Sequence, residues 1–144
     1  QFVGMLQIIR KRLSREGVKT LYLDGSTPPE TRQELCDRFN GGEGQVFLIS
    51  LKAGGTGLNL TGADLVIHYD PWWNPAVEDQ ATDRAHRIGQ TRDVDVVRLI
   101  AQGTIEEKVT DLSKRKRAIF DRVVLAGESA LEALTEEDIR SLFF

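Results

Sequence analysis

Two arginines three residues apart are the side chains of this 144-residue sequence best suited to chemistry. If the segment is helical, at about 100° per residue, Gln80, Arg84 and Arg87 share one narrow stripe. A neighbouring stripe of small or apolar residues would pack into the core: Ala81, Ala85 and Ile88. Two guanidinium groups placed in this way suit an anion such as a phosphate. The alternative is an ordinary solvated face, with Asp79 and Asp83 as ionic partners.

A glycine-rich stretch, residues 52–58, follows an apolar run and could bring its backbone close to a ligand. It is not a Walker loop, because no Lys-Ser or Lys-Thr pair follows Gly57. It is not a dinucleotide fingerprint either, because the G-x-G-x-x-G spacing is missing and Asp64 is too close to be the ribose carboxylate. A tight turn is the alternative interpretation.

The composition sets limits on the class of protein. Apolar residues make up 40% of the chain, which is the size of one domain with a real core. A membrane span and a secretory signal are not expected, because no long apolar run and no charged start followed by an apolar stretch is present. The net charge of −3 gives no overall attraction to nucleic acid, so such binding would need a local patch. Residues 84–122 hold ten Lys/Arg against six Asp/Glu.

The single cysteine and the two histidines do not indicate a reactive site. Cys36 cannot form an internal disulfide, which fits a reducing compartment, and we interpret it as a small residue on a helix rather than a catalytic thiol. His68 and His86 lack partners at metal-ligand spacing. We therefore predict no metal site in this chain.

Apolar patterns alternate between helix and strand along the sequence. Strands are expected at 20–23, 46–50, 65–69 and 94–101, and helices at 2–13, 28–39, 75–89 and 104–125, with a last short helix from 135. Thr27 with Glu30, and Thr104 with Glu107, have capping-box spacing, and Pro28 suits the first helical position. Apolar strands separated by helices predict an α/β fold of three layers, with a parallel sheet covered on both faces. Because the first residues already have helical spacing without a cap, we expect the chain to be cut from a larger protein.

Several long motifs, in order, resemble one family. Residues 80–90, Gln-Ala-Thr-Asp-Arg-Ala-His-Arg-Ile-Gly-Gln, closely resemble the sixth motif of the SWI/SNF-related helicase-like DNA translocases. Asp-Gly-Ser-Thr at 24–27, with Arg32, is similar to the fourth-motif region. Residues 50–60 are similar to the fifth motif, and Asp-Pro-Trp-Trp-Asn-Pro at 70–75 to the segment that joins the fifth and sixth. The resemblance covers nearly the whole chain.

This resemblance implies an architecture. Residues 1–103 would form the second, C-terminal helicase lobe, a three-layer RecA-like (P-loop NTPase-like) unit with a mainly parallel sheet. Residues 104–126 would form a long helix like the family's brace. Residues 127–144 would be an acidic C-terminal tail with a short helix.

The resemblance also implies an ATP site shared between two lobes. ATP with Mg²⁺ would be held mainly by the N-terminal RecA-like lobe of the same protein, which carries the Walker lysine and the magnesium carboxylates. Arg84 and Arg87 would be the arginine fingers, while Gln80, Gly57 and Asn59 would line the same cleft. The chain alone is therefore expected not to hydrolyse ATP.

The partner implied by the resemblance is double-stranded DNA. The residues implied to contact its backbone are Gly25, Ser26, Arg32, Ser50 and Lys52. Trp73 would be a groove-side aromatic residue. We place the adjacent Trp72 in the core, and the alternative is that both tryptophans are buried packing residues. The basic run 114–117 is interpreted as a solvated face, with contact to DNA or to the other lobe as the alternative.

The expected function is that of a motor lobe in an ATP-dependent DNA translocase that remodels protein–DNA complexes. Its expected location is the cytoplasm of a prokaryote or the nucleus of a eukaryote, away from membranes. Two other interpretations stay open at this stage: the second lobe of an RNA helicase, and a freestanding module that binds nucleic acid or protein.

Overall fold

The computed structural model describes residues 2–51, 53, 57–70, 72 and 74–126. These residues form two compact units. The first consists of Gln1–His68 with Val77–Val97, and the second of Tyr69–Ala76 with Arg98–Phe144.

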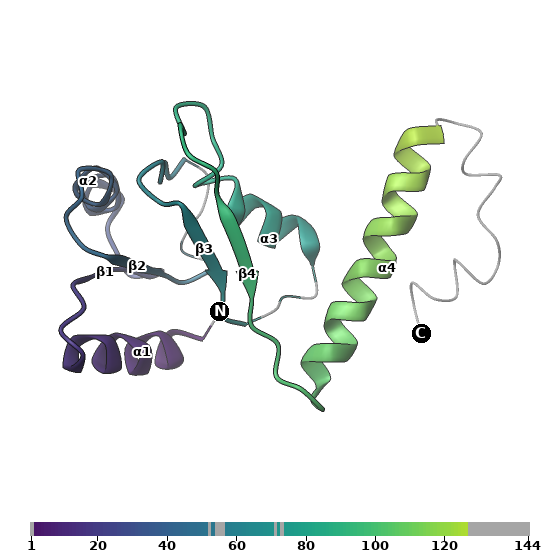
Figure 1. The fold of residues 1–144 in the computed structure, drawn as a ribbon, viewed down its shortest axis with the longest axis horizontal. Coiled ribbons are helices and arrows are strands. Elements are labelled where there is room, and N and C mark those ends of the chain that lie inside the picture. The colour runs from purple at the N-terminus through teal and green to yellow at the C-terminus, as the bar shows by residue number, and fades with distance from the viewer. Residues whose placement is uncertain (1, 52, 54–56, 71, 73, 127–144) are drawn as a thin grey trace. The chain divides into compact units, whose positions relative to one another are not determined.

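The first unit begins with a three-layer arrangement. The strands β1 (Thr20–Leu23) and β2 (Val46–Ile49) are parallel, with Thr20 opposite Val46 and Leu23 opposite Ile49. The helices α1 (Val3–Arg15) and α2 (Pro29–Asn40) lie on opposite faces of this strand pair (Figure 1). The four elements start and end within a few residues of the predicted positions, which confirms the α/β class with parallel strands.

The core of the first unit lies under α2. Its buried members come from β1, α2 and the loop that follows β2: Leu23, Cys36, Ala53, Leu58 and Leu60. The rings of Phe39 and Phe47 pack beside them with centroids 5.4 Å apart. Cys36 is completely buried on its helix, as predicted for a structural residue. Burial raises the pKa of its thiol, so a thiolate is disfavoured there.

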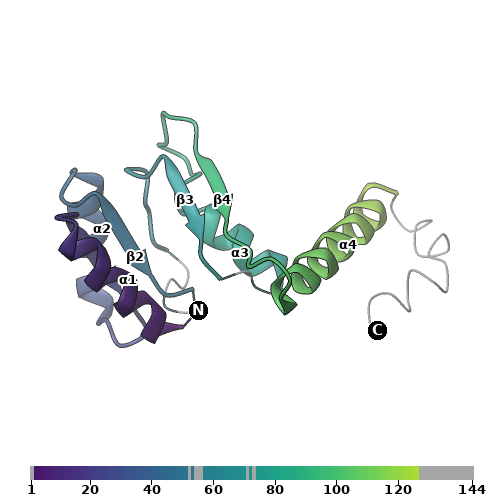
Figure 2. The ribbon, with the colours of Figure 1, turned by 60° about the horizontal axis from the view of Figure 1, so that its bottom comes forward.

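A second strand pair belongs to the same unit, except for Arg98, the last residue of its second strand. The strands β3 (Leu65–His68) and β4 (Asp95–Arg98) lie side by side and run in the same direction (Figures 1 and 2). The sequence predicted that they join β1 and β2 in one sheet covered on both faces. Among the described residues, β3 and β4 instead form a separate sheet, and this sheet is not covered on both faces. Leu65 and Ile67 are 49% and 54% exposed while His68 is buried, because successive residues of a strand face opposite sides and only one side of β3 is covered.

The start of α2 differs from the predicted capping box. The helix begins at Pro29 rather than Pro28, and no side chain caps it. The hydroxyl of Thr27 instead accepts a hydrogen bond from the backbone N–H of Asp24, at 3.1 Å. The Thr27 side chain therefore closes the preceding loop and is not available to the helix.

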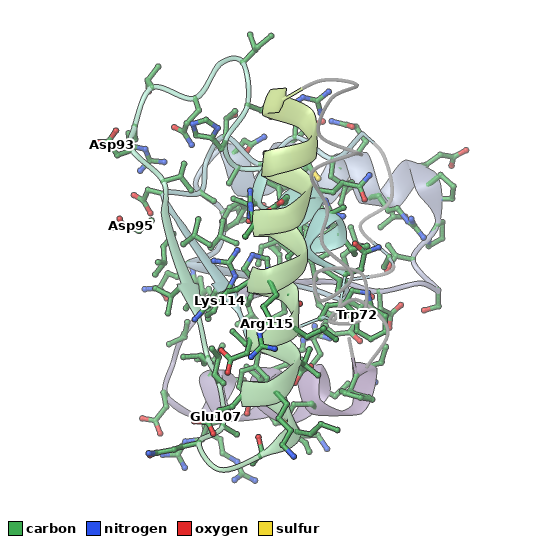
Figure 3. The ribbon with its side chains drawn as sticks, turned by 90° about the vertical axis from the view of Figure 1, so that its right-hand side faces the viewer. Trp72, Asp93, Asp95, Glu107, Lys114 and Arg115 are labelled. Carbon is green, nitrogen blue, oxygen red and sulfur yellow. The ribbon has the colours of Figure 1, made fainter. Side chains whose placement is uncertain are left out.

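The main element of the second unit is α4 (Ile105–Ala126), which begins where the sequence predicts. Thr104 Oγ1 accepts from the N–H of Glu106 at 3.2 Å, but Glu107 accepts from the N–H of Gly103 at 3.0 Å, one residue earlier than in a standard capping box. Figure 3 shows Lys114 and Arg115 projecting from the middle of α4, and both are exposed, as a solvated face requires. The predicted tail and its short helix lie outside the described residues.

No helix in the described part of the chain combines the length and the apolar composition that a membrane crossing needs.

The close approach of Gly62 to α2 gives a prediction about stability. A Cβ at Gly62 would lie 2.9 Å from Asn40 Cα and 3.2 Å from the Phe39 carbonyl oxygen, so backbone would have to shift. We expect Gly62→Ala to lower the free energy of unfolding by about 1–3 kcal/mol, the usual cost of overpacking. The matched control is Gly4→Ala in α1, where nothing lies within 4 Å of the new Cβ. Thermal unfolding of the purified variants measures both, and equal melting temperatures would contradict the close approach.

Candidate functional site

The segment with the two arginines is a turn and not a helix. The helix α3 (Pro75–Thr82) begins at the predicted Asn74-Pro75 pair, where Asn74 Oδ1 accepts from the N–H of Ala76 at 3.1 Å. It was expected to continue to about Gly89, but it ends seven residues earlier. We call residues 83–92 the sixth-motif turn. The predicted stripe of Gln80, Arg84 and Arg87 on one helical face is therefore wrong.

The helix α3 ends early because the sixth-motif turn forms hydrogen bonds to residues 57–64. These residues begin within the fifth motif, residues 50–60, and continue past its end, and we call them the fifth-motif segment. The backbone N–H of Leu60 donates to the carbonyl of Arg84 at 2.8 Å. Gln90 Nε2 donates to the carbonyl of Ala63 at 2.8 Å. The Arg84 carbonyl thus accepts from Leu60, whereas in a continuing α-helix it would accept from the N–H of Ile88.

Arg92 completes the pairing of the two segments. Its guanidinium donates to the Asp64 carboxylate and to the carbonyl of Gly62, both at 2.7 Å. Asn40, the last residue of α2, adds a bridge from the other side, because its amide donates to the carbonyl of Asn59 and accepts from the N–H of Gly62. The fifth-motif segment is thus held from both sides by side chains that bond to its backbone.

Arg84 is buried in this arrangement, with 7% of its surface exposed. Its Nε has no hydrogen-bond partner among the described residues. Burial lowers the pKa of this guanidinium, and the nearby Cys36 offsets the effect in part. An exposed position was expected for Arg84, and the structure corrects this: the guanidinium is packed against the core.

Arg87 and Ile88 lie on the outside of the turn. Arg87 is exposed, with Nη1 at the limit of hydrogen-bond distance from the carbonyl of Leu58, at 3.5 Å. Ile88 is 99% exposed, although the sequence pattern placed it in the core. Its neighbour Gly89 has φ of +101°, a conformation that favours glycine, and the chain reverses there.

The remaining residues implied for the nucleotide lie in the fifth-motif segment or on α3. Asn59 is half-buried, and its Oδ1 also lacks a hydrogen-bond partner among the described residues. Gly57 is exposed with φ of +109°, and Gln80 is exposed on α3. Buried polar atoms without partners are costly, so the two at Arg84 and Asn59 are candidates for a polar ligand. A guanidinium and an amide oxygen fit the phosphates and hydroxyl groups of a nucleotide.

The residues implied for DNA begin in the loop after β1, residues 24–27, which we call the fourth-motif loop. Asp24 Oδ1 accepts from both the N–H and the hydroxyl of Ser26, at 2.9 and 2.6 Å, and Oδ2 accepts from the Tyr22 hydroxyl at 2.8 Å. These bonds, those from Ser26 first, lower the pKa of the Asp24 carboxyl. Gly25 and Ser26 are exposed at the tip of this ordered loop.

Arg32 joins the fourth-motif loop to the loop after β2. From the first turn of α2 it donates to three backbone carbonyls: Thr27 at 2.8 Å, Gly25 at 3.3 Å and Ala53 at 2.9 Å. Ser50, at the end of β2, is 5% exposed. Lys52 and Trp73 lie outside the described residues, and Trp72 is half-buried in the second unit.

The described residues offer no cluster that would suit a metal ion, since no three His, Cys, Asp or Glu side chains among them come together. His68 is buried and its Nε2 lies 3.0 Å from the Thr82 hydroxyl, so it links β3 to the end of α3 as a structural residue. His86 is exposed.

Sequence reasoning missed Asn40, Gln90 and Arg92. Gln90 was visible as the last residue of the sixth-motif string, but only the structure shows that it bonds to Ala63 and Ala85 carbonyls. Nothing in the spacing of these residues pairs them with residues 57–64, because the contacts join positions 19–30 residues apart.

Residues 1–89 match the model of the helicase conserved C-terminal domain. The chain is 42% identical to an uncharacterized ATP-dependent helicase of Mycoplasma pneumoniae and 45% identical to the helicase swr1 of Aspergillus fumigatus, over 99% of this chain in both cases. It spans 14% and 8% of the length of these two relatives.

A solved structure, the C-terminal part of the Fun30 ATPase domain, is similar with a TM-score of 0.74 and 44% identity. The match covers 78% of this chain and 37% of that one. Sequence and fold therefore agree, and the chain belongs to the helicase conserved C-terminal domain family, as a RecA-like lobe of the kind found in SWI/SNF-related ATP-dependent helicases.

Proposed function

We propose that this chain is the second motor lobe of an ATP-dependent translocase on double-stranded DNA. It would complete an ATP site whose Walker lysine and magnesium carboxylates belong to an N-terminal RecA-like lobe of the same protein. The observation that carries the proposal is the pair of unpartnered buried atoms, Arg84 Nε and Asn59 Oδ1, in segments that many hydrogen bonds hold together. The chain alone is proposed to be inactive, since its sequence has no Walker loop.

Arg84 and Arg87 are proposed to act as arginine fingers. Bound ATP with Mg²⁺ supplies the phosphoryl group, on whose oxygens negative charge is concentrated during transfer. A guanidinium that is already desolvated, as that of Arg84 is, stabilises such charge more strongly than one in water. Arg87 is exposed and can approach a ligand from solvent. Gln80, Gly57 and Asn59 are proposed to line the same cleft.

DNA is proposed to bind by its backbone, without sequence preference. Gly25 and Ser26 are exposed and preordered by Asp24, so they are suited to contact phosphates through N–H and hydroxyl groups. Lys52 and Trp73 are proposed to contribute charge and an aromatic surface. Because Arg32 is bonded to three carbonyls and Ser50 is buried, we propose that these two hold the loops in position.

The biological setting follows as part of the same proposal. Relatives named swr1 and Fun30 support a parent protein that moves or remodels a protein–DNA complex. Such a protein works where its DNA is, in the nucleus of a eukaryote or the cytoplasm of a prokaryote.

Arg84→Met tests the finger assignment separately from stability. Methionine fills a similar volume without the cost of burying a charge, so we expect an unchanged or raised melting temperature. In the full-length protein the same change should reduce DNA-stimulated ATP turnover by about 10³–10⁵-fold. Steady-state ATPase and thermal unfolding measure the two effects. A lower melting temperature with normal turnover would show that Arg84 is a structural residue.

Arg87→Ala should give the same loss of turnover with little change in stability, because this side chain is exposed. DNA affinity should stay nearly unchanged. The matched control is Arg38→Ala on α2, which removes an exposed arginine paired with Glu43 and should leave turnover intact. Near-normal ATPase in Arg87→Ala would remove this residue from the nucleotide site.

Arg32→Lys tests the positioning role in the DNA track. Lysine keeps the charge but cannot bond to three carbonyls in one plane, so duplex affinity should fall while its salt dependence stays the same.

Lys52→Ala removes a phosphate contact, and should lower the slope of log affinity against log salt by about 0.9. Fluorescence anisotropy on the full-length protein over several DNA sequences measures both. A changed sequence preference in either variant would contradict backbone binding.

A further inference from the structure

The charge of this protein is unevenly distributed. Residues 1–19 contain five Lys/Arg and one Glu, a net charge of +4, although the whole chain has −3. The remaining 125 residues therefore have a net charge of −7. Most of residues 1–19 form α1, so a strongly basic helix lies on an acidic protein. Basic patches on one helix of an acidic chain are typical of sites for polyanions.

An open pocket of about 450 Å³ runs between α1 and β1. It is lined by Gln7, Arg10, Lys11, Ser14, Arg15 and Tyr22. The five α1 residues recur at spacings of three and four, so they form one stripe along the helix. Three of the six are cationic and the others carry hydrogen-bond donors, so the pocket can both attract and bond an anion.

Arg10 is held in place without losing its donors. Its guanidinium lies over the Tyr22 ring, with Cζ 5.0 Å from the ring centroid. Cation–π attraction holds the guanidinium over the ring, and its N–H groups can still donate to an oxygen ligand. The pKa of the Tyr22 hydroxyl is raised, by burial first and then by Asp24, although Gln7 and Arg10 act in the opposite direction.

The pocket is continuous with the fourth-motif loop. The Tyr22 hydroxyl donates to Asp24 Oδ2, and the other oxygen of Asp24 orders Ser26. Hydrogen bonds to Asp24 thus link the exposed tip of that loop to Tyr22, and the contact of Arg10 with the Tyr22 ring links Tyr22 to the basic stripe of α1. A strand of phosphates that contacts the loop has further cationic groups available along α1.

We propose that this pocket binds the phosphodiester backbone of duplex DNA and extends the DNA track from the fourth-motif loop onto α1. The inference rests on the proposed DNA-binding function and adds a second set of contacts to it. Arg10 and Lys11 make the ionic contacts, and Tyr22 positions Arg10. These contacts read no bases, so the site increases affinity and salt dependence and leaves sequence preference unchanged.

The test compares Arg10→Gln/Lys11→Gln with Arg12→Gln in the full-length protein. Arg12 lies on the same helix but outside the pocket lining, and pairs with Glu16 at 2.9 Å, so it is a matched control. Duplex affinity is measured by anisotropy at several salt concentrations, after thermal unfolding has shown that the variants are folded. We expect the double variant to lower the salt slope by about 1.8, so that from 50 to 200 mM salt the wild type loses about twelvefold more affinity than the variant. Arg12→Gln should keep the wild-type slope.

The salt slope of Lys52→Ala, measured in the same series, distinguishes a failure of the α1 site from a failure of the proposed DNA-binding function. If it lowers the slope and the double variant does not, the α1 site is wrong and the DNA track of the loops stands. If neither change affects the slope, both proposals are wrong. If Arg12→Gln lowers the slope by about 0.9, half of the change expected for the double variant, the binding follows total helix charge, and the pocket is overturned.

Discussion

The pairing of the fifth-motif segment with the sixth-motif turn is the constraint on which the candidate nucleotide site depends. Several of its contacts are hydrogen bonds to backbone carbonyls, from Leu60, Gln90 and Arg92. Bonds to the backbone fix the path of the chain whatever side chains the acceptor residues carry. Gly62 allows the closest approach, because it lets the segment reach the end of α2.

The buried guanidinium of Arg84 is an unfavourable group that the surrounding structure holds in place. A buried guanidinium with an unpartnered Nε costs free energy, and the surrounding hydrogen bonds must offset that cost. Groups kept in such an environment need little reorganisation when an opposite charge arrives. Replacing Arg84 by an apolar residue is therefore expected to keep or raise the stability of the fold and to lower the activity.

The sequence was a good guide wherever a local pattern decided the structure. Apolar runs predicted β1 and β2, helical spacing predicted α1, and the pair Thr104 and Glu107 predicted the start of α4, because each of these signals lies within a few neighbouring residues. The end of α3 could not be predicted in this way. Residues 83–88 continue a helical pattern, and bonds to partners more than twenty residues away override it.

In the candidate site, too, local sequence signals were predictive and long-range contacts were not. Motif order predicted which loops carry polar side chains, but burial of Arg84 and Ser50 depends on tertiary packing that spacing does not contain. The sequence predicted Thr27 as a helix cap, but its hydroxyl accepts from the nearby N–H of Asp24 and not from an N–H of the helix. The basic stripe of α1 was hidden by the net charge, which averages over an acidic remainder.

The three carbonyls bonded by Arg32 have a mechanical consequence. Gly25 and Thr27 follow β1, whereas Ala53 follows β2, and one rigid planar group connects all three. Gly25 and Thr27 are therefore tied to Ala53 directly through one side chain, and not only through the strands. In the proposed DNA translocase, a direct link of this kind would let two contacts on the same strand advance together and not one at a time.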